Sequence, residues 1–141
     1  MASLDLSLRS EYAIKAAVRL ALSYGNGPVR ARDIAEFGGI PPKFVEQVMH
    51  DLRQAGLVSS RRGKSGGYEL ARNPTLVRLA QVVEAVEGPL EETPPLSPGD
   101  EAGRFVQPVW ERVRQAAWSV LWSMSLGDAA ARAAASPMYY I

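Results

Sequence analysis

With 141 residues, of which 47% are hydrophobic and 22% charged, the chain is long enough for one globular domain and too short for two. It contains no cysteine and one histidine, His50, which excludes disulfides, thiolate metal sites and an all-histidine metal site within one chain. The net charge of +1 conceals an asymmetry, because residues 1–78 hold 12 basic and 7 acidic side chains whereas residues 79–141 hold 4 and 8. A polyanionic partner is therefore expected for the first part only.

Three helices are predicted in the first third of the chain. The first covers about 7–24, where apolar residues recur at spacings of three and four before a stretch rich in glycine. A short helix over 31–37 ends at two further glycines. Pro41 and Pro42 start the third helix, since proline is tolerated in a first turn, and Gly56 stands where a left-handed cap belongs. The apolar side of this third helix consists of Phe44, Val45, Val48, Met49 and Leu52.

A β-hairpin and a fourth helix are predicted next. Two short strands over 57–60 and 68–71 flank a basic, glycine-rich turn at 61–67. The fourth helix covers about 76–87. The following stretch, 89–103, holds four prolines and four acidic residues, so we expect a loop or disordered linker there.

A long final helix is predicted over 104–126, followed by a C-terminal tail at 127–141. At 100° per residue, its apolar residues form one broad face and a separate edge made by Trp118 and Trp122. If one face packs on the helix's own domain, the other needs a partner, and a second copy of the chain is the simplest one. A small-molecule pocket lined by tryptophans is the alternative. The broad face consists of Val106, Trp110, Val113, Ala117, Val120, Leu121 and Met124.

Two helices joined by a tight glycine turn and followed by a hairpin form a winged helix-turn-helix. The second helix of this motif fits the major groove of DNA, and a basic wing tip can enter the minor groove or rest on phosphates. The wing tip carries Arg61, Arg62 and Lys64, and no acid follows before Glu69. An ordinary solvated hairpin is the alternative reading of these charges, but their place after a helix-turn-helix favours DNA contact.

Residues 7–88 also resemble a known family. The stretches that carry the resemblance are LSLRSEYAIKAAVRLA at 6–21, IAEFGGIPPKFVEQVMHDLRQAGLVSSRRGKSGGYELARNP at 34–74 and VVEAVEG at 82–88. They are similar to the Rrf family of bacterial winged-helix transcriptional regulators, the group of IscR, NsrR and CymR. The resemblance implies a mainly α fold, with a winged helix-turn-helix over 1–88, a hairpin wing and a long C-terminal dimerisation helix.

Carried onto this sequence, the family's DNA-facing recognition turn falls on Pro41, Lys43, Glu46 and Gln47, and its wing arginine on Arg62. Glu46 can accept a hydrogen bond from a cytosine amino group, or it can orient its neighbours or repel wrong sites. His50 is expected to be an ordinary helix residue. The dimer contacts are expected from the final helix, at Trp110, Val113, Trp118, Leu121 and Trp122.

The sequence departs from the family at two places. Members that sense iron, nitric oxide or redox state carry three cysteines in the loop after the EG pair, but 89–103 has none, so a cysteine-ligated iron–sulfur cluster is excluded. A signal would then arrive through an unknown small molecule or protein effector, and 89–103 is either where it enters or an idle linker. The second departure is Arg78, where the family has Thr or Ser as a cap, and Thr75 is expected to cap the fourth helix instead.

We therefore predict a DNA-binding regulator and no enzyme, metal or cofactor. No nucleophile motif surrounds any serine, and the wing glycines precede a strand, whereas a phosphate-binding loop opens a helix. The expected activity is that of a homodimeric repressor on a palindromic operator of double-stranded DNA. A winged-helix interaction module without DNA binding is the alternative. No apolar run is long enough to span a membrane and no secretory signal is present, so we expect a cytoplasmic protein.

Overall fold

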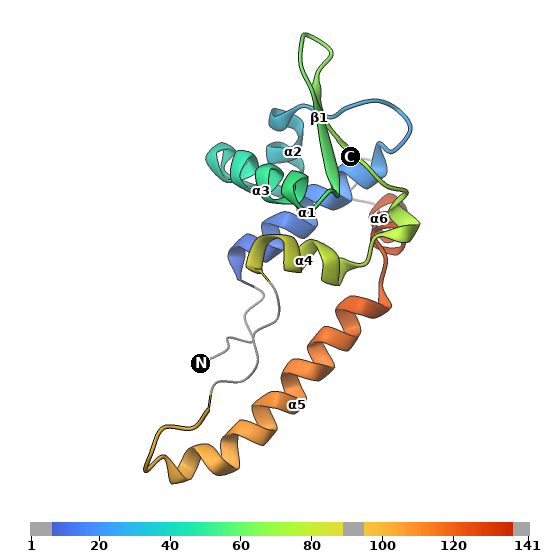
Figure 1. The fold of residues 1–141 in the computed structure, drawn as a ribbon. Coiled ribbons are helices and arrows are strands. Elements are labelled where there is room, and N and C mark those ends of the chain that lie inside the picture. The colour runs from blue at the N-terminus through green and yellow to red at the C-terminus, as the bar shows by residue number, and fades with distance from the viewer. Residues whose placement is uncertain (1–6, 89–94, 137–141) are drawn as a thin grey trace.

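The computed structural model describes residues 7–88 and 95–136, and its elements confirm a mainly helical winged-helix fold (Figure 1). A compact domain carries a projecting hairpin, and one long helix extends away from it on the opposite side (Figure 1). Within the described ranges, no helix combines the length and apolarity that crossing a membrane requires.

The centre of the domain is helix α1, Leu8–Leu22, which packs against four other helices and against the hairpin. Its buried stripe is made of small residues, so that neighbouring helices can approach closely. The side chains of Ala13 and Ala16 are fully buried, and Leu20 is almost so. Helices α2, Ala31–Gly38, and α3, Pro42–Gln54, follow as the two halves of the predicted helix-turn-helix. Gly39 joins them in a left-handed conformation with φ of 60°, which accounts for the glycine there.

The hairpin consists of β1, Val58–Arg61, and β2, Gly67–Leu70, paired antiparallel with Val58 opposite Leu70. A 3₁₀ turn, Pro74–Leu76, leads to α4, Leu79–Glu87, which is shorter than predicted. The expected cap at Thr75 is wrong. The Asn73 side chain accepts from the Thr75 backbone N–H at 3.0 Å. Helix α4 begins only at Leu79, and its N-terminal cap is Arg78, whose backbone N–H donates to the Gln81 side chain at 2.8 Å.

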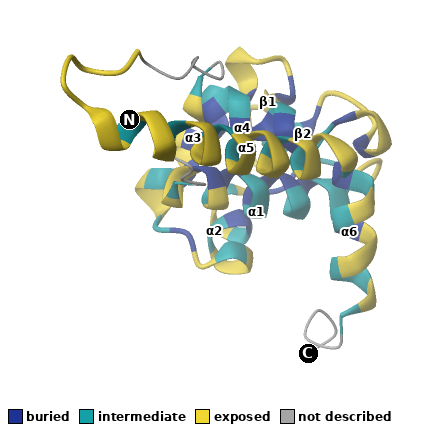
Figure 2. Ribbon diagram, turned by 90° about the horizontal axis from the view of Figure 1, so that it is seen from below, coloured by how far each residue is buried: buried dark blue, intermediate teal, exposed yellow. Residues whose placement is uncertain are grey.

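Helix α5, Glu101–Ser123, is the long predicted helix, starting and ending three residues earlier than expected. Residues 89–94 of the predicted linker lie outside the described residues, and its last three residues belong to this helix. None of the 23 residues of α5 is buried (Figure 2). An Asp100 carboxylate oxygen accepts from the Gly103 backbone N–H at 2.9 Å and caps the helix.

Each of the two apolar faces of α5 is covered only in part by the described chain. Trp118 and Leu121 are half-buried, and Leu121, at the end of the broad face, packs against the core of the domain. The earlier part of the broad face is exposed, with Trp110 at 45% and Val113 at 42% of their full accessible surface. Trp122 is exposed as well and meets Trp118 edge to face, with ring centroids 6.3 Å apart. The broad face from Val106 to Val120 is therefore left uncovered by the described residues.

A sixth helix, α6 at Leu126–Ala135, replaces most of the predicted tail, whose residues 137–141 are not described. It returns to the winged domain, where Leu126 is fully buried and its N–H donates to the Val77 carbonyl at 2.8 Å. The start of α6 is capped reciprocally by Ser125 and Asp128, at 3.0 Å in each direction. The Ser125 backbone N–H and then its hydroxyl lower the pKa of the Asp128 carboxyl. Helix α6 is thus part of the compact domain, whereas α5 extends outside it.

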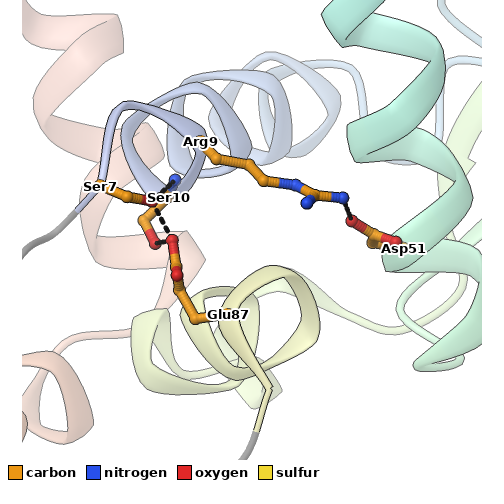
Figure 3. Close-up of polar contacts among 5 residues, drawn as sticks. All are labelled: Ser7, Arg9, Ser10, Asp51 and Glu87. Carbon is orange, nitrogen blue, oxygen red and sulfur yellow. Dashed lines mark hydrogen bonds and ion pairs between the residues drawn. The ribbon is translucent and has the colours of Figure 1, made fainter. Parts of the chain in front are cut away.

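A polar cluster joins α1 to α4 and to α3 (Figure 3). The hydroxyls of Ser7 and Ser10 both donate to one carboxylate oxygen of Glu87, with 2.7 Å for the buried Ser10. Ser7 also caps α1 by accepting from the Ser10 N–H. On the other side of α1, the Arg9 guanidinium forms an ion pair with Asp51 of α3. The start of α1 is thus fixed both to the end of α4 and to α3.

We expect Glu87→Ala to lower the free energy of unfolding by about 1–2 kcal/mol, because the buried Ser10 hydroxyl would lose its acceptor. Urea denaturation of the purified protein measures this. Glu84→Ala is the matched control, since it removes an equal charge from the same helix and Glu84 makes no ion pair within the described residues. Equal stability of the two variants would contradict a structural role for the cluster.

Candidate nucleic-acid interface

Helix α3 separates its apolar and polar residues cleanly. Val45, Val48 and Leu52 are completely buried against the rest of the domain. The opposite side of the helix is exposed, as the sequence analysis expected for a surface that enters a groove. Of the four residues of the predicted recognition turn, Pro41 is the N-terminal cap and half-buried. The exposed polar residues of this side are Lys43, Glu46, Gln47 and His50.

The aromatic rings of Phe44 and Tyr12 pack against each other beside the recognition turn. Phe44 is half-buried rather than fully buried, and its ring lies 5.6 Å from that of Tyr12 on α1. The Lys43 ammonium lies 5.3 Å from the centre of the Phe44 ring, within range of a cation–π contact. The side chain of Glu46 makes no hydrogen bond or ion pair with any other described residue. It therefore orients neither Lys43 nor Gln47 in the DNA-free chain, and its carboxylate is available to a ligand.

The three basic residues of the wing are not equivalent. Arg61 ends β1, and its Nε lies 2.9 Å from an oxygen of Glu69 on the partner strand. This pair neutralises Arg61 in part. Arg62 and Lys64 lie in the turn beyond the strands, are exposed, and form no ion pair with the described part of the chain. The cationic charge of the wing tip is therefore concentrated on Arg62 and Lys64.

The wing is anchored to the segment before α2. Val29 and Tyr68 exchange two backbone hydrogen bonds of 2.8 Å, which form an isolated antiparallel β-bridge beside the hairpin. A Cβ on Gly67 would stand 2.4 Å from the Val29 carbonyl oxygen, so only glycine fits there. Gly67 is therefore required by the packing of the chain on itself.

One further basic residue at the wing was missed by the sequence analysis. The Arg30 guanidinium donates to the Lys64 backbone carbonyl at 2.8 Å, so the start of α2 and the wing tip are linked directly. Arg30 is separated from the wing by 30 residues or more, and no spacing rule brings it there. The signal available in the sequence was only its positive charge next to a predicted helix start.

A helix with an exposed polar side, preceded by a supporting helix and followed by a basic wing, defines a winged-helix DNA-binding domain. The sequence profile of Rrf2, described as an iron-dependent transcriptional regulator, matches residues 6–132. The chain belongs to the Rrf2 family of DNA-binding transcriptional regulators, and it is not an enzyme. The HTH-type transcriptional regulator CymR of Bacillus subtilis is 32% identical over 127 residues, which cover 90% of each chain.

Solved structures agree with this assignment. The structure of CymR (YrzC), titled the global cysteine regulator of B. subtilis, superposes with a TM-score of 0.78 at 32% identity, covering 92% of this chain and 98% of that one. The structure of T. potens IscR gives a TM-score of 0.76 at 33% identity, covering 97% and 96%. The similarity thus extends beyond the winged domain to the long helix.

The iron in the family's description does not fit these residues. The 141 residues contain no cysteine, and the one histidine, His50, is exposed on α3. Among the described residues, no group of three or more His, Asp or Glu side chains is placed to hold a metal ion. Cysteine ligation of an iron–sulfur cluster is therefore excluded in this sequence.

Proposed function

We propose that the chain is a homodimeric, sequence-specific transcriptional repressor that binds a two-fold symmetric operator in the cytoplasm. The observation that carries the proposal is the exposed apolar face of α5. A helix of 23 residues with no buried residue gains little stabilisation from packing within a single chain. A second copy would cover this face and would be related to the first by a two-fold axis.

The same geometry sets the form of the operator. A symmetric dimer presents two copies of α3, and these reach successive major grooves when they are about one DNA turn, or 34–36 Å, apart. The operator is then a palindrome whose half-sites share that spacing or a multiple of it. Fluorescence anisotropy tests the proposal, with the DNA upstream of the chain's own gene as the first fragment, since such repressors often control themselves. The proposal would be contradicted if neither this fragment nor sites selected from random duplexes bound more tightly than random DNA.

The competing function is a winged-helix interaction module that does not bind DNA. The exposed Arg62 and Lys64 favour DNA, because a protein-binding wing has no need for unpaired cations at its tip. The exposed Glu46 neither favours nor opposes it. Absence of any salt-dependent binding to DNA would favour the interaction module.

We expect Glu46→Ala to relax base preference at one or two positions of each half-site and to change affinity for random DNA little. Glu46 is exposed in the first turns of α3 and has no partner within the described chain, so its carboxylate can accept from a cytosine amino group. Selection of binding sites from random duplexes, followed by sequencing, measures the preference.

Gln54→Ala is the control for Glu46→Ala, because Gln54 is also exposed on α3 but lies in its last turn, far from the recognition turn. A selected site identical to that of the parent protein would show that Glu46 reads no base. A selected site changed equally by both substitutions would show a general effect on the helix.

A further inference from the structure

A hollow of about 620 Å³ lies between the start of α2 and the wing tip. The side chains that line it include four cations, Arg30, Arg61, Arg62 and Lys64, and no acidic residue. Glycines 63, 66 and 67 form much of the remaining lining of the hollow, so backbone atoms make up much of its surface. Such a site has the chemistry of an anion-binding pocket.

The cations of this hollow keep unused donors. Arg61 is paired with Glu69, but Arg62 and Lys64 form no ion pair with the described residues. Arg30 gives one N–H to the Lys64 carbonyl, and a guanidinium has five N–H groups, so several remain. The same hydrogen bond holds the flexible wing turn against α2, which keeps the cations close together before any ligand arrives.

We infer that Arg30 and Lys64 form a binding site for one backbone phosphate of the DNA, with Arg30 as a DNA-contacting residue outside the helix-turn-helix and wing. The inference rests on the proposed function and adds a contact to it. DNA is the source of the phosphate because wing-tip residues line the hollow and the hairpin projects beyond the helices (Figure 1), where a duplex held by α3 and the wing supplies a row of phosphates.

The test is the affinity of Arg30→Ala for a random-sequence duplex, measured by anisotropy at several salt concentrations. We expect about a tenfold loss near 0.1 M salt, and a slope of log affinity against log salt that is shallower by about 0.9 for the lost phosphate contact. The control is Arg32→Ala, which removes an equal charge from the exposed side of the same helix but does not line the hollow. It should stay within twofold of the parent protein.

Lys64→Ala supplies a second, independent variant. If both side chains bind one phosphate, the double variant should lose less affinity than the two single losses multiplied together. An unchanged slope for Arg30→Ala, an equal loss for Arg32→Ala, or fully independent losses for Arg30 and Lys64 would overturn the inference. Circular dichroism and urea denaturation of Arg30→Ala show whether any loss arises from misfolding.

Two further arms separate other outcomes. Inorganic phosphate, titrated into the DNA-free protein at matched ionic strength, should leave its melting temperature unchanged. Saturable stabilisation that Arg30→Ala abolishes would assign the hollow to a free anion and overturn the DNA assignment. If the variants behave as expected on random duplex but selection yields no preferred sequence, the phosphate site stands and the sequence-specific function fails.

Discussion

Val113→Glu should convert the protein from a dimer to a monomer and lower its operator affinity by about 10²–10⁴-fold. Val113 lies near the middle of the exposed apolar face of α5, between Trp110 and Val120 on the helix surface. In a symmetric dimer, each interface would then bury two carboxylates without partners, which opposes association. A monomer binds one half-site and loses the effective concentration that links the second half-site to the first. Light scattering after gel filtration and anisotropy with the operator measure the two effects.

Ser119→Glu is the matched control for Val113→Glu. Ser119 is exposed on the polar side of the same helix, so the same added charge stays in water. This control should remain a dimer with parental affinity. Trp118, an expected dimer contact, is a poorer target for substitution than Val113. It is half-buried, so its replacement would also disturb packing within the chain. Dimeric Val113→Glu protein with full operator affinity would place the interface elsewhere.

The elements of the winged domain follow from local sequence signals. The helix spacing of apolar residues, the turn glycines and the basic hairpin are each encoded within about 15 residues, so their order could be predicted. Helix α6 was missed because its residues are mostly alanine, which supports a helix without marking a buried face. The burial of Leu126 and Ala130 defines that face, and burial depends on the tertiary fold.

The candidate site was predictable to the same extent. The exposed side of α3 follows from helical periodicity, which assigned Lys43, Glu46 and Gln47 correctly to the surface. The pairing of Arg61 with Glu69 depends on strand register, and the contact of Arg30 with Lys64 joins residues 34 positions apart. Periodicity defines the apolar faces of α5 but cannot tell which neighbour covers each residue, so the packing of Leu121 on the domain and the exposure of Trp122 could not be predicted.

Arg62→Ala should weaken operator binding by about 1–3 kcal/mol, which corresponds to about 5- to 150-fold. Arg62 is the first residue beyond β1, exposed at the wing tip and without an ion pair among the described residues. Its guanidinium is therefore not held by the protein and can enter the narrow minor groove, where the negative potential of DNA is strongest over A·T-rich steps. Anisotropy with the operator and with random duplex at matched salt measures the loss for each.

The comparison with Arg61 separates groove insertion from simple charge. Arg61 is tied to Glu69 at 2.9 Å, so the double variant Arg61→Ala/Glu69→Ala removes the pair without changing the net charge. This variant should bind within a few-fold of the parent protein, since an exposed ion pair contributes little. A residue that enters the groove reads its width, so Arg62→Ala should lose more affinity for the operator than for random duplex. Equal losses on both DNAs would limit Arg62 to phosphate contact, and affinity equal to that of the parent would remove the wing tip from the interface.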